Sequence, residues 1–199
     1  PIDIEKDDLI VGNTLEDGVV VRVTLPWFIT DEEYKDICYN GAEQVGKLAH
    51  KTPYYPRLLE LGVSKIIKKI DTKISDLQRR LDGNGSDGEV LRRKIDYFNA
   101  MKRELSAVVS MAHRYADIAD GQREVETDPV RREELGRIAS VCRRVPEFPA
   151  ETFHEAVQSV WFAQYAFFTT GTNIPAGRLD QYLYPFLKAD LENGGITLD

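Results

Sequence analysis

Residues 152–190 read TFHEAVQSVWFAQYAFFTTGTNIPAGRLDQYLYPFLKAD, and they contain the clearest structural pattern in the chain. Thr152 is followed three residues later by Glu155, which is the spacing of a helical capping box. Apolar residues then recur at intervals of three and four, as on one face of an amphipathic helix. This pattern predicts a helix over 152–170. We expect it to be the most buried helix of the chain, with Trp161 in its core.

A loop and a second helix follow directly. Gly171, Pro175 and Gly177 interrupt the helical pattern and predict an irregular loop over 169–177. A new helical pattern begins near Arg178 and ends at the Asn-Gly-Gly sequence of residues 193–195, which is a typical C-cap signal. The stretch is therefore predicted to be a helix, a loop and a second helix.

The remainder of the chain is also mostly helical in its patterning. Amphipathic periodicity predicts two helices over 63–82 and 89–123, joined as a hairpin by the glycine-rich segment 83–88. A further helix is predicted from Asp128-Pro129 to Pro146. Nearer the N-terminus, the β-branched run 19–25 predicts a strand and the acidic residues after Thr30 predict a helix. The predicted fold class is mainly α, with an extended arm over 1–30 and a helical region over 31–199 in one partial domain.

Composition excludes several classes of protein. The 199 residues are 42% hydrophobic and 30% charged, as in soluble globular domains. A formal net charge of −7 disfavours a nucleic-acid partner. No stretch approaches the roughly 20 apolar residues of a membrane-spanning helix, so we expect no membrane partner. Two cysteines give no disulfide framework, and we expect a reducing, cytoplasmic location.

The reactive side chains form no recognisable catalytic set. His50, His113 and His154 are scattered and have no cysteine or carboxylate at the spacing of a metal site, which argues against metal binding. Cys38 and Cys142 both lie in helical patterns, and we expect both to be buried structural thiols. We therefore predict no catalytic residue and no metal ligand in this chain.

Two blocks of the sequence carry a resemblance to a known family. RVPEFPAETFHEAVQSVWF at 144–162 and GRLDQYLYPFLKADLENGGIT at 177–197 resemble the glycyl radical enzymes, or pyruvate formate-lyase-like proteins, in their dehydratase and lyase branch. LIVGN at 9–13 and the outline His50, Pro53, Tyr54, Gly62 resemble the same family. The chain departs from the family pattern because no glycine precedes His50. The span from Asn13 to His50 also looks shorter than in typical members.

The resemblance implies a fold and an activity for a longer protein. In this family a barrel of strands is wrapped by helices, and this chain would form part of the outer helical layer in the N-terminal half. The whole enzyme would eliminate water from, or cleave a C–C or C–X bond in, a small polar substrate by radical chemistry. Its catalytic cysteine and its radical glycine would lie outside this chain, which would bind no cofactor itself. A radical SAM iron–sulfur activase would install the glycyl radical, and the enzyme would be an anaerobic homodimer.

The resemblance also points to the loop 169–177 as the part that touches substrate. An ungapped carry-over from Gly177-Arg178 puts Thr172 and Asn173 at substrate-binding positions. Arg178 and Asp180 are two residues apart, a spacing at which helical side chains do not face each other. We expect each of them to support the loop by pairing with another element. The plainer interpretation is a loop that only satisfies its own backbone.

A second hypothesis from another class remains open. The chain could be a non-catalytic helical scaffold or interaction protein derived from the family. A Gly-Cys-x-Glu-like motif and a C-terminal Arg-Val-x-Gly-Tyr-like motif elsewhere in the reading frame would favour the enzyme.

Overall fold

A computed structural model describes residues 3–12, 30, 32, 52–83, 87–169 and 174–197 of the chain. Within these ranges the chain forms helices α2 to α7 and no strand, which confirms the predicted mainly α class. The predicted strand over 19–25 lies outside the described residues, as does nearly all of the helix predicted after Thr30. The division into an arm and a helical region therefore stays a prediction.

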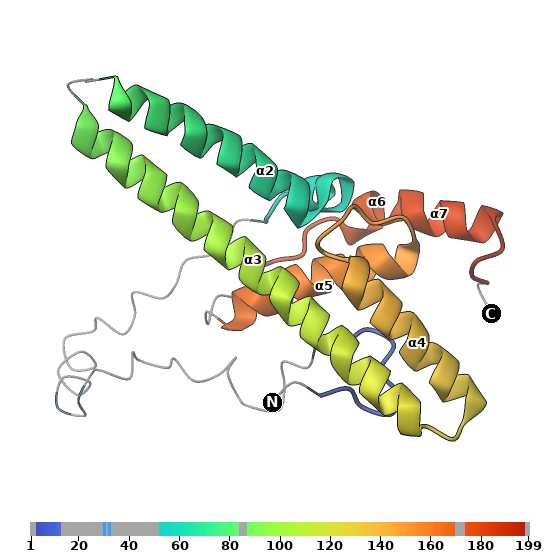
Figure 1. The fold of residues 1–199 in the computed structure, drawn as a ribbon. Coiled ribbons are helices and arrows are strands. Elements are labelled where there is room, and N and C mark those ends of the chain that lie inside the picture. The colour runs from blue at the N-terminus through green and yellow to red at the C-terminus, as the bar shows by residue number, and fades with distance from the viewer. Residues whose placement is uncertain are drawn as a thin grey trace.

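The longest helix, α3 (Gly88–Val125), runs the length of the molecule and organises its neighbours. α2 (Tyr55–Asp82) lies antiparallel to its first half, and α4 (Pro129–Arg144) returns along its second half (Figure 1). The α2–α3 hairpin therefore confirms the prediction from the glycine-rich segment. α4 begins as predicted, because Pro129 occupies its first turn and the Asp128 carboxylate accepts a hydrogen bond from the Val130 amide at 3.0 Å.

α2 begins several residues before the predicted start at 63 and is broken at Gly62. That residue has φ +65° and ψ 164°, which a glycine adopts at little cost. The break brings the backbone of residues 146–150 against the helix, where the Val63 amide donates to the Pro146 carbonyl at 2.8 Å. A Cβ atom at position 62 would lie 2.4 Å from the carbonyl carbon of Phe148. The close approach of two backbones therefore requires glycine here.

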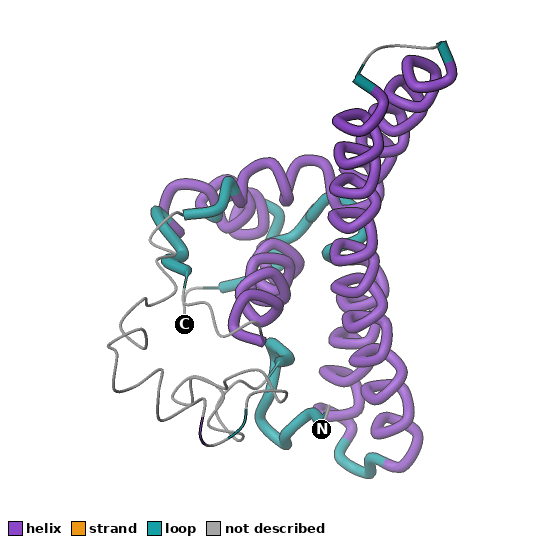
Figure 2. Tube along the Cα trace, turned by 90° about the vertical axis from the view of Figure 1, so that its left-hand side faces the viewer, coloured by secondary structure: helices purple, strands orange, loops and turns teal. Residues whose placement is uncertain are grey.

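α5 (Phe153–Thr169) crosses the middle of the molecule beside α3 (Figure 2). Its predicted cap is present, because the Glu155 amide donates to the Thr152 hydroxyl at 3.2 Å. The Glu155 carboxylate accepts from the Glu151 amide at 2.7 Å, which satisfies a second donor at this helix end. α5 has the largest share of buried side chains among the described helices, as predicted: Glu155, Ala156, Gln158, Ser159, Val160, Phe162 and Gln164.

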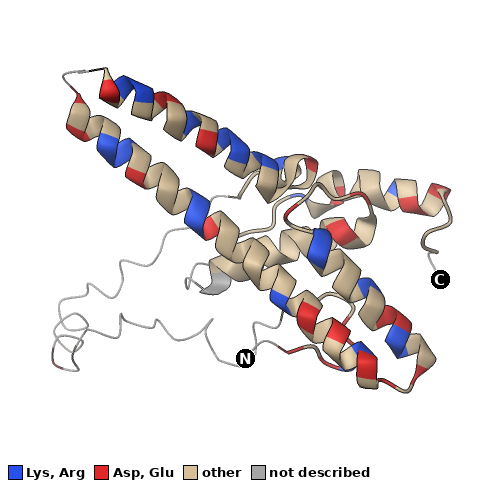
Figure 3. Ribbon diagram, in the orientation of Figure 1, with Lys and Arg blue, Asp and Glu red and all other residues tan. Residues whose placement is uncertain are grey.

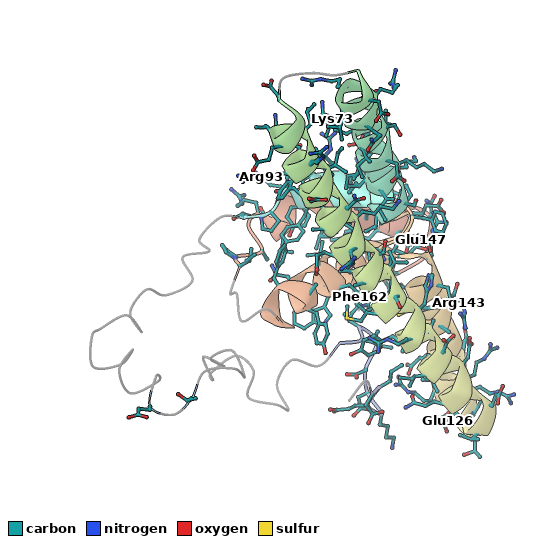
Figure 4. All side chains as sticks on the ribbon, turned by 60° about the vertical axis from the view of Figure 1, so that its left-hand side comes forward. Lys73, Arg93, Glu126, Arg143, Glu147 and Phe162 are labelled. Carbon is teal, nitrogen blue, oxygen red and sulfur yellow. The ribbon has the colours of Figure 1, made fainter. Side chains whose placement is uncertain are left out.

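The aromatic anchor of the core is Phe162 and not Trp161. Phe162 is fully buried and packs on Tyr115 of α3 with ring centroids 5.8 Å apart (Figure 4). Trp161, also expected in the core, is partly buried rather than solvent-exposed, and it lies at the edge of the core. The two side chains are about 100° apart around the helix, and it is the Phe162 side that meets α3 and α4.

A stripe of polar side chains on α5 holds the N-terminal segment 9–12. The Gln158 side chain accepts from the Val11 amide at 2.8 Å and donates to the Val11 carbonyl at 2.9 Å. One turn before it, His154 Nε2 lies 2.8 Å from the Leu9 carbonyl. One turn after it, the Trp161 indole donates to the Gly12 carbonyl at 2.7 Å. These positions share one helix face, so α5 holds the irregular segment 9–12 through hydrogen bonds to its backbone.

Residues 3–8 are held in the same way from α3 and α4. The buried Arg131 guanidinium donates to the carbonyl of Asp8 at 2.9 Å and to that of Glu5 at 2.7 Å. Gln122 of α3 donates to the Ile4 carbonyl at 3.0 Å. Because these contacts reach backbone atoms, they fix the path of the segment more than the identity of its side chains.

The helix predicted from Arg178 to Asn193 is divided in two, α6 (Leu179–Tyr182) and α7 (Tyr184–Glu192). Pro185 lies in the first turn of α7, where it lacks the amide that would continue the preceding helix. The predicted C-cap is present, with Gly194 at φ +70° and the Gly195 amide bonded to the Asp190 carbonyl at 2.8 Å. The Asp190 carboxylate accepts from the Phe153 amide and so joins α7 to the start of α5.

Charge is distributed in keeping with this core. Figure 3 shows Lys, Arg, Asp and Glu side chains mixed along α2, α3 and α4, and few of them on α5. The buried part of the molecule therefore holds few charged side chains, among them Arg131 and Glu155, and most of the mixed charges lie on α2, α3 and α4.

Candidate functional site

The described part of the predicted substrate loop is residues 174–177, which lead from the end of α5 to α6. Thr172 and Asn173, the predicted substrate-binding residues, lie outside the described residues. The site is therefore built from the remainder of the loop and from what surrounds it.

Two contacts fix the path of the loop before α6. Gly177 has φ +72°, and a Cβ atom there would lie 2.6 Å from the Thr52 methyl group, so both conformation and space require glycine. One residue earlier, the Ala176 carbonyl accepts a hydrogen bond from the Tyr182 hydroxyl at 2.7 Å. This segment is therefore anchored both to Thr52 before α2 and to α6.

Among the residues that the structure describes, Arg178 and Asp180 pair with each other, which differs from the expected pairing of each with another element. Arg178 Nε lies 2.9 Å from Asp180 Oδ1, and Arg178 Nη2 lies 2.7 Å from Asp180 Oδ2. The reason is that Arg178 is the N-cap of α6 with φ −88° and ψ 73°, so helical spacing does not apply to it. The bidentate pair lowers the pKa of the Asp180 carboxyl, and it clamps the turn where the loop enters α6.

A cavity of about 500 Å³ lies between the loop, α5, α6 and the N-terminal segment. Its walls are apolar except for Gln164: Ile10, Val157, Val160, Trp161, Ile174, Pro175, Ala176, Leu179 and Leu183. Ile10 reaches it because His154 and Gln158 hold the residues on either side. The volume and the apolar walls are typical of small-molecule sites, in which a few polar groups then orient the ligand.

One chain of contacts links the interior of α5 to the loop. Gln164 donates to the Tyr55 hydroxyl at 2.6 Å, and Tyr55 packs on Tyr182 with ring centroids 5.7 Å apart. Tyr55 is almost fully buried, and its burial, followed by the neighbouring Tyr182, raises its pKa to about 12. Both phenols therefore stay protonated near neutral pH and act as hydrogen-bonding groups.

The sequence prediction missed Tyr55 and Tyr182 as parts of this site. Tyr55 precedes an amphipathic helix, and Tyr182 lies among other aromatic residues, so neither stands out in the sequence. Gln164 offered the better signal, because a polar residue on the apolar face of a buried helix needs a hydrogen-bonding partner.

Cys142 is buried as predicted, and its thiol has low reactivity. Only 1% of its surface is exposed, and burial raises the pKa of its thiol to about 12. A thiol with that pKa supplies almost no thiolate near neutral pH, so it is a poor nucleophile or metal ligand. Cys38 lies outside the described residues.

The described histidines are structural. His154 Nε2 faces the Leu9 carbonyl, which can only accept, so this nitrogen carries the proton. His113 Nε2 lies 3.1 Å from a carboxylate oxygen of Glu147. In the part of the chain that the structure describes, no cluster of three His, Cys, Asp or Glu side chains could hold a metal ion.

The sequence matches a known family of proteins. The profile of the family described as pyruvate formate lyase-like matches residues 11–199, so this chain belongs to that family. The isethionate sulfite-lyase of Bilophila wadsworthia is 48% identical over 148 residues. The trans-4-hydroxy-L-proline dehydratase of Clostridioides difficile is 38% identical over 142 residues. The resemblance to glycyl radical lyases and dehydratases is thus confirmed.

The chain corresponds to only part of these relatives. The matches cover 72% and 69% of this chain but 17% of the length of each relative. A glycyl radical enzyme from Archaeoglobus fulgidus has a similar structure, with a TM-score of 0.73 and 28% sequence identity. The match covers 99% of this chain and 31% of the Archaeoglobus chain. The described helices are thus a helical portion of a glycyl radical enzyme fold. None of the helices described in this chain is long and apolar enough to cross a membrane.

Proposed function

We propose that this chain is the part of a glycyl radical lyase or dehydratase that supplies one wall of the substrate pocket. The observation that carries the proposal is the cavity beside the loop, walled by Ile174, Pro175 and Ala176. The relatives named above act as a lyase and a dehydratase on small polar molecules, by their own names. The apolar walls suit the hydrocarbon part of such a substrate, and polar groups must orient the remainder.

Thr172 and Asn173 are the polar groups that we propose for this role. Both have short side chains that hydrogen-bond hydroxyl or carboxylate groups. They directly precede the described wall of the cavity at Ile174 in the sequence. Arg178 and Asp180, through their mutual ion pair, would keep the far end of the loop in place.

The radical chemistry itself is assigned to parts of the enzyme outside this chain. Members of this family work through a protein radical, and we propose that a radical SAM iron–sulfur activase forms it on a glycine. A thiyl radical on a cysteine outside this chain would abstract hydrogen from the substrate. The raised pKa of the Cys142 thiol and its burial support a structural role for this residue. We propose a homodimer working in an anaerobic cytoplasm.

The decisive experiment is anaerobic activation of the full-length protein, followed by electron paramagnetic resonance. A glycyl radical doublet is expected, and turnover would then be measured with isethionate and with trans-4-hydroxy-L-proline. If the full-length protein forms no radical under conditions that activate a known relative, the scaffold hypothesis replaces this proposal.

The loop is tested by substitution in the activated enzyme. Thr172→Val and Asn173→Ala should each lower kcat/KM between about threefold and a hundredfold, because each removes a hydrogen bond to substrate. Neither change should move the melting temperature appreciably. Asn99→Ala, at an exposed position of α3, is the matched control and should leave both unchanged. Normal turnover in both loop variants, or a loss of activity in step with stability, would place the pocket elsewhere.

A further inference from the structure

The Ala176 carbonyl is held by a side chain rather than by the backbone. The segment 174–177 belongs to no helix or strand, so its polar backbone groups need partners from elsewhere. The next carbonyl, that of Gly177, is satisfied locally by the Leu179 amide at 3.1 Å. The Ala176 carbonyl instead accepts from the Tyr182 hydroxyl at 2.7 Å. Ala176 lies in the wall of the cavity, so this bond acts on the cavity directly.

The position of Tyr182 is itself determined by the core. Its ring packs on that of Tyr55 at 5.7 Å, with the planes inclined by 38°. Tyr55 cannot easily move, because it is almost fully buried and accepts a hydrogen bond from Gln164 of α5. The rigid helix α5 thus holds the buried Tyr55 ring, and the Tyr55 ring positions the Tyr182 ring. The Tyr182 hydroxyl in turn holds the loop.

Gln164 of α5 takes part in this series of contacts and also lines the cavity. Gln164 holds Tyr55, and it is also the polar residue in the otherwise apolar lining of the cavity. The two walls of the cavity, formed by residues 174–176 and by α5, are therefore held by the same series of contacts. A binding site needs such support, because small displacements of its walls change how well a substrate fits.

We propose that Tyr182 is a positioning residue, whose hydroxyl holds the 174–176 wall at the distance from α5 that the substrate requires. The inference rests on the proposed function, because it assumes that this wall contacts substrate. Tyr182 does not touch the reacting atoms in this role. It acts through the hydrogen bond from its hydroxyl to the Ala176 carbonyl, so removing the Tyr182 hydroxyl oxygen should expose the positioning role.

The test compares Tyr182→Phe with Tyr184→Phe in the full-length protein. Each change removes one phenolic oxygen, but Tyr184 is 58% exposed and lies outside the chain of contacts. Tyr182→Phe removes the hydrogen bond to the Ala176 carbonyl and so loosens the segment around it. Hydrogen exchange at the amides of Ala176, Gly177 and Arg178 should therefore become roughly two- to tenfold faster. It should be unchanged in Tyr184→Phe. Equal exchange in both variants and the wild type would overturn the inference.

A kinetic measurement on the activated enzyme separates positioning from mere stability. Tyr182→Phe should raise KM roughly tenfold while kcat changes less than twofold, because the wall binds substrate but performs no chemistry. Tyr184→Phe should leave both constants unchanged, and both variants should melt at the same temperature. An unchanged KM in Tyr182→Phe, with faster exchange, would also overturn the inference, since the loop would then be held but would not bind substrate.

The two proposals fail in different ways. Absence of the radical doublet in the wild-type protein would refute the proposed function, while hydrogen exchange would still decide whether Tyr182 fixes the loop. Reduced turnover in Thr172→Val together with a normal KM in Tyr182→Phe would refute the positioning role and leave the proposed function standing.

Discussion

At the scale of single residues, several side chains of the core hydrogen-bond to the backbone of the N-terminal segment. His154, Gln158 and Trp161 all contact the backbone of residues 9–12, and Arg131 holds two further carbonyls. Gln158 is fully buried, so its amide has no water to replace Val11 as a partner. The N-terminal segment is therefore part of the core, although it has no regular secondary structure.

Gln158→Leu should destabilise the protein strongly. The change leaves the buried Val11 amide and carbonyl without partners, and each unpaired group costs about 1–3 kcal/mol, so we expect a total of about 2–6 kcal/mol. Urea denaturation followed by circular dichroism would measure it. Gln78→Leu, at an exposed position of α2, is the control and should change stability by less than about 0.5 kcal/mol. Equal stability of the two variants would contradict this account of the segment.

His154 should make stability depend on pH. Burial is the main cause that lowers its pKa, because it disfavours the charged imidazolium, and nearby Arg137 acts in the same direction. The unfolded chain, with a histidine pKa of about 6.5, therefore binds this proton more readily than the folded chain. The stabilising contribution is complete above about pH 6.5 and is lost as the pH falls below it.

The measurement is the unfolding midpoint of the wild type and of His154→Gln between pH 7.5 and pH 5.5. The wild type should lose more stability than the variant over this range, because the variant has no imidazole to protonate at this position. Parallel pH profiles would show that His154 titrates alike in the folded and unfolded chains.

At the scale of elements, helix ends and breaks decide how the helices meet. Gly62 interrupts α2 so that residues 146–150 can pack against it, and the Ala150 amide donates to the Leu59 carbonyl at 3.0 Å. Arg144 then ties this segment to α5 through ion pairs with Glu151 and Glu155. The connection between α4 and α5 is thus held on both sides, although it is neither helix nor strand.

Gly62→Ala should be costly, because the added methyl group would meet backbone that cannot move aside and because φ +65° is unfavourable for alanine. We expect a loss of about 2–4 kcal/mol, combining backbone strain with overpacking. The matched control is Gly121→Ala within α3, where nothing lies within 4 Å of the added atom. That change should stabilise the protein by up to about 1 kcal/mol. Thermal unfolding measures both, and a tolerated Gly62→Ala would refute the need for glycine.

At the scale of the whole molecule, the chain matches only a limited part of the length of its relatives. It covers 17% of the isethionate sulfite-lyases and 31% of the Archaeoglobus fulgidus structure. Its buried middle holds apolar and hydrogen-bonded side chains, and no cluster of side chains among the described residues could hold a metal ion. Under the proposed function, this chain would contribute shape and support, and the radical residues would lie outside it.

The full-length enzyme carrying both Cys38→Ala and Cys142→Ala should therefore retain radical-dependent turnover. The buried thiol of Cys142 packs against Tyr115, Leu135 and their neighbours, so its loss should lower the melting temperature without abolishing activity. Turnover and the radical signal would be measured together. If activity disappears while the circular dichroism spectrum and cooperative unfolding are retained, at least one of these thiols has a chemical role.

Local patterns by themselves determined much of this protein. The spacing of apolar residues, the Thr152–Glu155 cap and the Asn-Gly-Gly ending predicted the helices of 152–195, because these signals act within one or two turns. Two short blocks also indicated the family. Only the tertiary structure decided that Phe162 fills the core, that Arg178 pairs with Asp180, and that Tyr182 holds the loop. The reason is that burial depends on which face meets a neighbour, and hydrogen bonds such as Gln158 to Val11 join residues 147 positions apart.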